Sequence, residues 1–331
     1  MTASANPRPH LVITNYVQDE VIHFLSTFAR VSANRSQAPW SQRSLLEAAQ
    51  DADGLLMFMP DCVDAQFLDQ CPRLRSIAGA MRGFDNFDLE ACEARGIRYK
   101  FIPNLLAAPT AELTVAMLIS LARSMPAGDA FVRSGRFLGW RPKFYSKGVV
   151  NSTVGIVGMG QLGLEFTKRM QGFGATLLYN DPVRLEHSQE QCFGLNYVAF
   201  SELIERSDHL VVMVPLENNT LHLFNAEVLT RCKPGAVIIN PCRGSVVDEQ
   251  AVVKALETGH LAGYGADVFE MEDWARPDHP DCIPQGLLDQ RERTVLTPHI
   301  GSAVQVIRED IAMTAARNLK ALVQSTLSPI A

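Results

Sequence analysis

Three residues in the second half of the chain, Arg243, Glu272 and His299, have side chains suited to anion binding and proton transfer. The planar guanidinium of an arginine can hold an oxyanion through two parallel hydrogen bonds. An imidazole can move a proton near neutral pH, and a carboxylate beside it fixes its tautomer and orientation. Each residue alone would be read as a surface charge or a structural histidine, but all three follow predicted strands. Because parallel strands end at one edge of a sheet, we expect the three residues to share a site.

A cofactor site beside these residues is predicted by a glycine-rich turn, G-M-G-Q-L-G, whose glycines are Gly158, Gly160 and Gly163. The turn follows an apolar run, residues 153–157, that is typical of a buried parallel strand, and it precedes a helical pattern. Gly158 allows a tight turn, Gly160 lets backbone N–H groups approach a pyrophosphate, and Gly163 lets the helix pack closely on the sheet. Strand, turn and helix in this order predict a dinucleotide-binding βαβ unit.

An acidic residue after the next apolar run, Asp181, indicates which dinucleotide is bound. A carboxylate at this position accepts hydrogen bonds from the ribose hydroxyls of NAD, and its charge repels the 2′-phosphate of NADP. Arg184 lies three residues further on and could weaken that preference. Taken alone, Asp181 could also be a turn residue ahead of Pro182. The sequence therefore favours NAD without excluding NADP.

The composition of the 331-residue chain, 47% apolar and 20% charged, is ordinary for a globular protein. A net charge of −6 argues against a nucleic-acid or membrane-surface partner, so an anion site must be built from a few local cations. Seven scattered cysteines without a C-x-x-C pair indicate reduced thiols, and no metal site is predicted. The N-terminus has no signal-peptide pattern, and the longest apolar stretch, residues 113–122, is about half the length of a spanning helix. We expect a cytoplasmic protein with a small anionic substrate.

Strand-like and helix-like segments alternate along the chain, which is typical of parallel sheets with helices on both faces. In the first third, strands are predicted at residues 11–13, 55–58, 74–78 and 97–101, with helices at 17–28, 41–50, 65–71 and 87–95. In the larger part that follows, strands are predicted at residues 153–157, 176–179, 210–214, 236–240, 263–268 and 294–297. Asp248 is expected to cap a helix over residues 249–257, and a long helix is expected from 302 to about 323. The pattern predicts two α/β lobes, each a doubly wound parallel sheet, with a cleft between them.

One predicted helix, residues 111–123, is apolar on nearly every side, which is unusual for a helix at the surface of a monomer. We expect this helix to be buried on more than one face, in part by a second subunit. Together with the following segment, through Phe131 and Trp140, it predicts a homodimer.

Four segments give the chain a resemblance to a known family. They are G-M-G-Q-L-G at 158–163, N-P-C-R-G-S-V-V-D-E at 240–249, D-V-F-E-M-E-D-W-A-R at 267–276 and T-P-H-I-G-S-A-V at 297–304. In order and spacing they resemble the D-isomer-specific 2-hydroxyacid dehydrogenases over nearly the whole chain. Within this family the likeness is greatest to the phosphite dehydrogenases, through F-M-P-D-C-V-D-A at 58–65, G-F-D-N-F-D at 83–88 and A-F-V-R-S-G-R-F-L-G-W at 130–140.

The resemblance implies roles for individual residues. Arg243 would anchor the substrate anion, His299 would be the acid/base and Glu272 its partner. The substrate pocket would be lined by Met59, Arg82, Gly83, Arg308, Trp140 and Tyr145, and the cofactor would contact Gly158, Gly160, Gln161, Leu162, Gly163, Asp181, Pro182, Pro215, Cys242 and Asp267. Residues 105–297 would form a Rossmann NAD-binding domain, and residues 1–104 with 298–331 a smaller, flavodoxin-like substrate domain. Phosphite dehydrogenases have lysine where this chain has Arg82, whose side chain keeps the charge but is bulkier and forked.

These features predict an NAD-dependent phosphite dehydrogenase. Arg82, Arg243 and Arg308 would hold the tetrahedral dianion while water attacks phosphorus and the hydride leaves to NAD. His299 is favoured as the base, although Arg308 is also expected nearby. Two other interpretations stay open: a 2-hydroxyacid dehydrogenase or glyoxylate reductase with the same dyad, and an NADH-sensing binding protein. Steady turnover with phosphite as the only reductant would separate the three.

Overall fold

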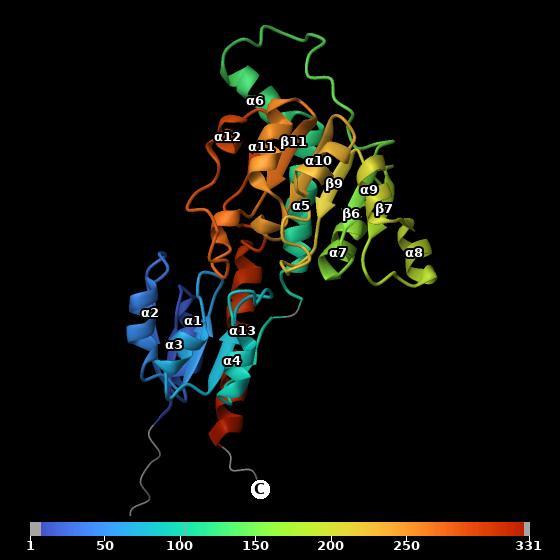
Figure 1. Ribbon diagram of the computed structural model, residues 1–331. Coiled ribbons are helices and arrows are strands. Elements are labelled where there is room, and N and C mark those ends of the chain that lie inside the picture. The colour runs from blue at the N-terminus through green and yellow to red at the C-terminus, as the bar shows by residue number, and fades with distance from the viewer. Residues whose placement is uncertain (1–7, 103, 328–331) are drawn as a thin grey trace, which may run out of the picture. The chain divides into compact units, whose positions relative to one another are not determined.

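The computed structural model describes residues 8–102 and 104–327, and the chain forms two compact units, each with helices around its own parallel sheet (Figure 1). The first unit combines Met1–Leu106 with Ala303–Ala331, and the second unit is Ala107–Ser302. The chain therefore leaves the first unit once, builds the whole second unit and returns. The borders between the units lie near those expected from the sequence, after residues 104 and 297.

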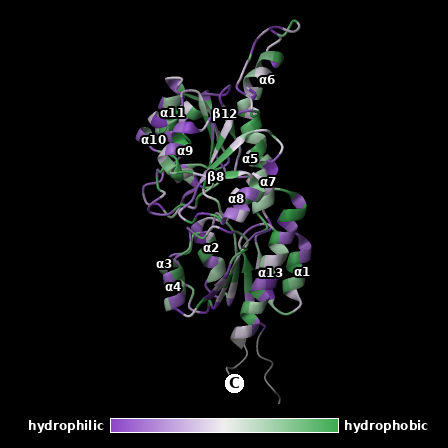
Figure 2. Ribbon diagram, turned by 90° about the vertical axis from the view of Figure 1, so that its right-hand side faces the viewer, coloured by the Kyte–Doolittle hydropathy of each residue, from purple (hydrophilic) through white to green (hydrophobic). Residues whose placement is uncertain are grey.

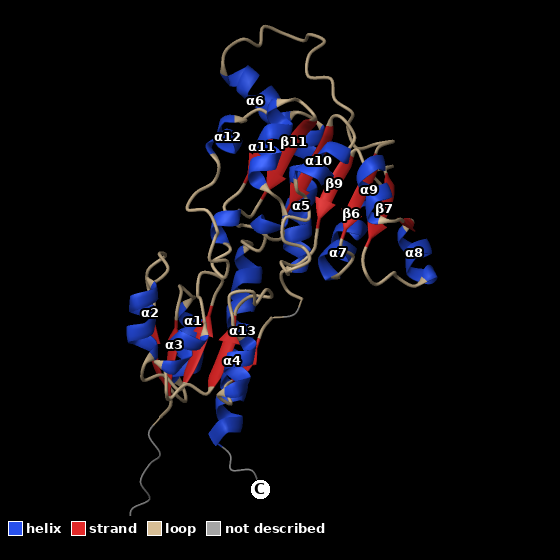
Figure 3. Cartoon of the chain, viewed as in Figure 1, coloured by secondary structure: helices blue, strands red, loops and turns tan. Residues whose placement is uncertain are grey.

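The smaller unit is built on a five-stranded parallel sheet with the order β2-β1-β3-β4-β5 (Figure 3). Its strands are β1 His10–Ile13, β2 Arg30–Ala33, β3 Gly54–Met57, β4 Ser76–Gly79 and β5 Arg98–Lys100. Its helices are α1 Asp19–Ser26, α2 Gln42–Ala49, α3 Ala65–Asp69, α4 Leu89–Ala94 and the C-terminal α13 Gln305–Leu327. This strand order is that of flavodoxin-like sheets, in which the winding direction reverses between β1 and β3.

Alternation of side chains along the strands decides which helices cover which face of the smaller sheet. In β1, Leu11 and Ile13 belong to a core that includes side chains of α1 and α13. Val12 points to the opposite face and belongs to a core with α2, α3 and α4. All three side chains are fully buried, as expected for a parallel strand covered on both faces. Figure 2 shows the surrounding helices, such as α13, with both hydrophobic and hydrophilic residues.

The larger unit is built on a seven-stranded parallel sheet with the order β12-β11-β10-β9-β6-β7-β8. Its strands are β6 Thr153–Val157, β7 Thr176–Asn180, β8 Leu195–Tyr197, β9 His209–Val212, β10 Ala236–Asn240, β11 Leu261–Ala266 and β12 Thr294–Leu296. Its helices are α5 Ala107–Ala122, α6 Met125–Arg133, α7 Gln161–Met170, α8 His187–Phe193, α9 Phe200–Arg206, α10 Ala226–Arg231, α11 Glu249–Glu257 and α12 Gln285–Asp289, with two short 3-10 helices, η1 Gly244–Val246 and η2 Glu270–Glu272. This is the Rossmann order with one further edge strand, and the winding direction reverses between β6 and β9. The predicted fold class, two doubly wound α/β lobes, is confirmed.

Helix α5 is the apolar segment that we expected a second subunit to cover. It packs against α7 and across β10, β11 and β12 of its own unit, with Ala111, Met117 and Leu121 among its buried residues. One chain therefore explains the apolar character of α5, which gives no evidence for a dimer. None of the described helices is by itself long and apolar enough to cross a membrane; α5 and α6 reach the required length and composition only as a pair, bent by 65°.

Candidate active site

The glycine-rich turn joins β6 to α7 where the strand order of the larger sheet reverses. Gly158 has a φ of +94°, and a Cβ there would lie 2.4 Å from the carbonyl oxygen of Met213, just after β9. A Cβ on Gly163 would lie 2.5 Å from the carbonyl oxygen of Gly158. Around the N-cap residue Gly160, by contrast, no described atom beyond its chain neighbours lies within 4 Å of the Cβ position. Packing therefore requires two of the glycines, and the third leaves the amino end of α7 open to an anion.

Asp181 follows β7 and holds the glycine-rich turn from the other side. Its two carboxylate oxygens accept hydrogen bonds from the backbone N–H groups of Met159 and Val183, at 2.7 and 2.8 Å. Each carboxylate oxygen has two lone pairs, so both can also accept a bond from a ribose hydroxyl. The other predicted cofactor contacts open α7 or follow strands at this same edge of the sheet: Gln161, Leu162, Pro182, Pro215, Cys242 and Asp267.

His299 and Glu272 form the predicted pair. Nδ1 of His299 lies 2.7 Å from Oε2 of Glu272, and the two side chains are 33% and 27% exposed. Glu272 is itself oriented, because its Oε1 accepts a hydrogen bond of 2.8 Å from the backbone N–H of Phe269. With Nδ1 turned to the carboxylate, Nε2 is the ring atom left to exchange a proton with a substrate.

Asp267 fixes the loop that carries His299. Its Oδ1 accepts hydrogen bonds from the Thr297 hydroxyl and the Ile300 N–H, at 2.5 and 2.8 Å, and its Oδ2 accepts one from the Gly301 N–H, at 2.7 Å. The backbone of His299 has a φ of +53°, which a non-glycine residue adopts only when its surroundings hold it there. The side chain of Asp267 is buried, and burial raises its pKa while these hydrogen bonds oppose the rise. Asp267 thus has a positioning role that the sequence did not indicate, besides the predicted cofactor contact.

The loop that carries Arg243 lies directly against the segment that carries Glu272. A Cβ on Gly244 would lie 1.9 Å from the carbonyl carbon of Phe269, so only glycine permits this approach of the two backbones. Asn240 donates a hydrogen bond of 2.7 Å to the carbonyl oxygen of Arg243 and fixes the start of the loop. The structure therefore brings together the three loops that we predicted from the sequence to share a site.

A buried cluster of acidic residues joins the Arg243 and Glu272 loops from the side of α11. The backbone N–H of Glu249 donates to the carboxylate of Glu270, at 3.1 Å, and the N–H of Glu270 donates to that of Glu249, at 3.0 Å. Arg276 donates a hydrogen bond of 2.8 Å to the carboxylate of Glu270 and one of 2.7 Å to the hydroxyl of Ser245. The backbone N–H of Ser245 in turn donates to the carboxylate of Asp273, at 2.8 Å. Burial, and then the neighbouring carboxylates, raise the pKa of Glu249 to about 8. None of these residues was predicted to take part in the site.

In the smaller unit, the predicted substrate-binding residues lie at the carboxyl edge of the sheet. Met59 follows β3, Arg82 follows the adjacent β4, and Asn86 connects their loops with a hydrogen bond of 2.9 Å to the carbonyl oxygen of Met59. The side chain of Arg82 is exposed. The guanidinium of Arg308, on α13, lies 5.9 Å from the centre of the Phe58 ring, and burial lowers its pKa. Two cationic side chains thus belong to this edge.

Asp61 anchors this edge at the point where the smaller sheet reverses direction. Its carboxylate accepts hydrogen bonds from the hydroxyl of Thr14, which follows β1, and from the N–H of Phe58, which follows β3, at 2.5 and 2.7 Å. Burial raises the pKa of Asp61 to about 6, although these hydrogen bonds act in the opposite direction. Asp61 therefore ties the segment that carries Met59 to the neighbouring strand, a role that the sequence did not indicate.

Trp140 and Tyr145 are two further residues for which the resemblance implied substrate contacts. They belong to the segment between α6 and β6, which extends beyond the end of the larger sheet opposite the carboxyl ends of its strands (Figures 1 and 3). Both side chains are exposed, by 83% and 80%. Within one chain the segment leads away from the loops of Arg243 and His299, so the substrate contacts expected of Trp140 and Tyr145 stay a prediction.

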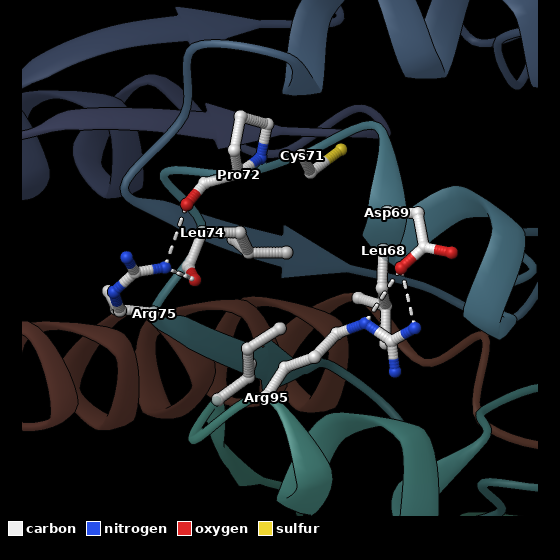
Figure 4. A pocket seen from close by; sticks show the side chains of 8 residues that line it. Leu68, Asp69, Cys71, Pro72, Leu74, Arg75 and Arg95 are labelled. Atoms are coloured by element: carbon white, nitrogen blue, oxygen red, sulfur yellow. Dashed lines mark hydrogen bonds and ion pairs between the residues drawn. The ribbon is translucent and has the colours of Figure 1, made fainter.

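A surface pocket of about 290 Å³ in the smaller unit lies beside the starts of β4 and β5, away from the carboxyl edge (Figure 4). Arg75 donates to the carbonyl oxygens of Pro72 and Leu74, and Arg95 binds Asp69 at 2.6 Å. Arg95 is thus paired with an acid of the pocket wall, and the pocket lies at the end of the sheet opposite Met59 and Arg82. We do not assign it to the active site.

The fold and site of the larger unit define a dinucleotide-dependent oxidoreductase with an acid/base pair at the carboxyl edge of a Rossmann sheet. The open end of α7 fits a pyrophosphate and Asp181 fits the ribose hydroxyls of NAD. Among the residues that the structure describes, no group of three or more His, Cys, Asp or Glu side chains could hold a metal ion.

Comparison with known proteins identifies the family. Residues 115–301 match the model of the NAD-binding domain of D-isomer-specific 2-hydroxyacid dehydrogenases. A glyoxylate reductase from Thermococcus litoralis is 35% identical over 327 residues, which cover 97% of this chain and 96% of that protein. Among solved structures, a D-lactate dehydrogenase from Aquifex aeolicus, complexed with NAD and lactic acid, is 25% identical with a TM-score of 0.83 and 97% coverage of both chains. An NADPH-dependent glyoxylate/hydroxypyruvate reductase from Sinorhizobium meliloti is 29% identical with a TM-score of 0.80, over 95% of this chain and 93% of that one.

The chain therefore belongs to the D-isomer-specific 2-hydroxyacid dehydrogenase family, and its cofactor is NAD. The names of these relatives favour the first alternative interpretation, a hydroxyacid dehydrogenase or glyoxylate reductase, over phosphite oxidation.

Proposed function

We propose that this protein interconverts a 2-oxoacid and the corresponding 2-hydroxy acid, of D configuration where that acid is chiral, with glyoxylate as the first substrate to test. The observation that carries the proposal is the His299–Glu272 pair, 2.7 Å apart, because the segment of Glu272 lies directly against the loop of Arg243. A pure NADH-binding protein would have no need of an oriented acid/base pair. The glyoxylate reductase and D-lactate dehydrogenase among the relatives support this substrate class.

The chemistry assigns one task to each side chain. When bound, the nicotinamide supplies the hydride for C2 of the oxoacid. Arg243 binds the substrate carboxylate with its guanidinium fork, and Nε2 of His299 donates a proton to the carbonyl oxygen. Glu272 holds the ring by Nδ1 and stabilises the imidazolium that precedes the transfer. The reverse reaction returns the proton to Nε2 of His299.

The decisive experiment compares substrates with the purified full-length protein. We expect NADH oxidation with glyoxylate or hydroxypyruvate, and NAD reduction with D-glycerate or D-lactate in preference to their L isomers. A protein that binds NADH but turns over none of these compounds, nor phosphite, would support the NADH-sensing alternative instead.

Phosphite oxidation is the second candidate, and the cations of the smaller unit favour it. Phosphite is tetrahedral and largely doubly charged near neutrality, so more than one cation favours its binding, and the smaller unit has Arg82 and Arg308 at one edge of its sheet; a carboxylate can be bound by a single arginine. In this reaction the hydride leaves phosphorus for NAD, a water oxygen forms the new P–O bond, and His299 takes the water proton. Rapid NAD reduction by phosphite without turnover of any 2-oxoacid would establish this candidate and overturn the first. Arg82→Ala should then raise the KM for phosphite strongly, and Arg82→Lys should restore it.

We also propose that the protein is a homodimer formed through the segment that follows α5. This segment exposes large apolar side chains, among them Leu138 at 79% and Trp140 at 83%. Exposed apolar groups gathered on one extended segment are typical of a subunit interface. The interface would therefore involve the segment from α6 to β6 and not α5.

A further inference from the structure

Arg184, which the sequence left as a possible partner for a 2′-phosphate, is bound to another group in the structure. Its Nε and Nη2 donate to the two carboxylate oxygens of Glu190, on α8, at 2.8 and 3.0 Å. The guanidinium also lies 5.2 Å from the centre of the Tyr197 ring, on β8. A bidentate pair with a ring stacked against it fixes the direction of the arginine as well as its position. The fork therefore points to α8 and not to the turn at Asp181.

Glu190 is held more firmly than Arg184. The Glu190 residue is only 6% exposed, whereas the Arg184 side chain is 60% exposed. Oε1 of Glu190 also accepts a hydrogen bond of 2.8 Å from the hydroxyl of Tyr179, which in turn accepts one of 2.9 Å from the N–H of Leu185. The hydrogen bonds from Arg184, and then from Tyr179, hold the pKa of Glu190 at about 2, so it stays ionised.

This asymmetry decides how freely Arg184 can turn to a cofactor. An exposed guanidinium loses little when it moves into water, but a buried carboxylate left without its cation loses much more. Among the described residues, His187 also lies near this carboxylate, with its Nδ1 3.7 Å from Oε2 of Glu190, and it is charged only when protonated. The need of Glu190 for a counter-ion thus keeps Arg184 from the ribose of the cofactor.

We propose that Glu190 is a specificity-determining residue that withholds Arg184 from a 2′-phosphate and so strengthens the preference for NAD. Discrimination then has two parts. Asp181 repels the phosphate, and Glu190 holds Arg184, which lies three residues further along the chain, away from it. The proposal concerns the cofactor alone, so it can fail while the proposed substrate stands, and the reverse also holds.

The test uses equilibrium binding of NADP and NAD to the full chain, measured by titration calorimetry. In an Asp181→Asn background, which removes the repulsive charge, adding Glu190→Gln should lower the Kd for NADP by at least about tenfold, equivalent to 1.4 kcal/mol. Glutamine keeps an oxygen that can accept the hydrogen bond from the Tyr179 hydroxyl, but it is neutral, so its burial requires no counter-ion. The Kd for NAD should change by no more than about twofold, because NAD has no 2′-phosphate.

Arg184→Ala is the matched control in both backgrounds. With Glu190 present it should change the Kd for NADP by less than about threefold, and with Gln at position 190 it should abolish the gain. An unchanged Kd for NADP after Glu190→Gln, or a gain that persists without Arg184, would overturn the proposal. If the Glu190→Gln protein does not fold, the Arg184→Ala comparison decides alone: a large loss of NADP affinity would show that Arg184 already reaches the phosphate, and no loss would support its sequestration.

Discussion

Replacing Glu249 by glutamine tests whether a proton-retaining acid joins the two catalytic loops. Glu249 is only 1% exposed. Its Oε1 accepts a hydrogen bond from the backbone N–H of Glu270, whereas its Oε2 has no hydrogen-bond partner among the described residues. The charges that act on it, on Glu270, Asp273 and Glu272, are all negative. Burial first, and these carboxylates second, raise its pKa to about 8 from an ordinary value of 4.5. Glutamine has the shape of the protonated acid and cannot ionise.

The direction of the effect follows from which state of the protein holds the proton. Below about pH 4.5 the folded and unfolded chains are both protonated at Glu249, and its ionisation does not affect stability. From there to about pH 8 the unfolded chain has lost a proton that the folded chain keeps, so the free energy of unfolding falls as pH rises. At about 1.4 kcal/mol per pKa unit, the full difference corresponds to an upper limit of about 5 kcal/mol. Glu249→Gln removes this dependence.

Urea unfolding of the full chain at pH values near 5.5 and 8.5 would measure the effect. If the two units unfold in separate transitions, the transition that NAD shifts to higher urea concentration is that of the larger unit, because a ligand stabilises only the unit that binds it. We expect the stability of Glu249→Gln, relative to the unchanged protein, to rise by several kcal/mol between the two pH values. Glu257→Gln, at the exposed end of the same helix, is the control and should show a constant difference. A constant difference for Glu249→Gln as well would show that Glu249 does not retain its proton.

Three further predictions concern the site and the assembly. His299→Ala should lower kcat by about 10²–10⁴-fold while the Kd for NADH, measured by fluorescence, stays the same. Retained turnover would show that His299 is not the acid/base of the reaction. Asp61→Asn should raise the KM for the substrate about fivefold without changing NADH affinity, because it weakens the hydrogen bonds from Thr14 and Phe58 that position the Met59 loop. An unchanged KM would show that this loop does not affect substrate binding. Sedimentation should show a dimer that Trp140→Asp converts to a monomer, and a monomeric unchanged protein would contradict the proposed interface.

The fold could be predicted wherever a local pattern was strong. The strands β6 and β10 and the helix α11 lie at the predicted residues, and Asp248 caps α11 by accepting from the N–H of Ala251 at 2.9 Å. Two edge strands, β2 and β8, were missed. They are only four and three residues long, and their side chains are mostly exposed or half-buried, so no apolar run marks them. Their pairing with β1 and β7 depends on the sheet and not on their own sequence.

The residues of the candidate site could likewise be predicted only in part from the sequence. Arg243, Glu272 and His299 could be predicted because each follows an apolar run that ends at one edge of a parallel sheet. The buried acids could not be predicted, because their partners lie far along the chain: Asp61 binds Thr14, 47 residues away, and Glu249 binds Glu270, 21 residues away. From the sequence alone, such carboxylates are indistinguishable from ordinary surface charges.

The position of these acids follows from a requirement that every loop at a sheet edge must meet. Beyond the last residue of a strand, backbone N–H groups lose their ladder partners and must find other acceptors when they are buried. A carboxylate accepts several such bonds at once, so one acid can fix a whole turn. Asp267 does this for the loop of His299, and Asp61 does it for the segment of Met59. The side chains that perform chemistry can therefore stay partly exposed while their backbones are rigid. It also follows that replacing either acid should disturb the placement of the reacting groups before it disturbs the fold.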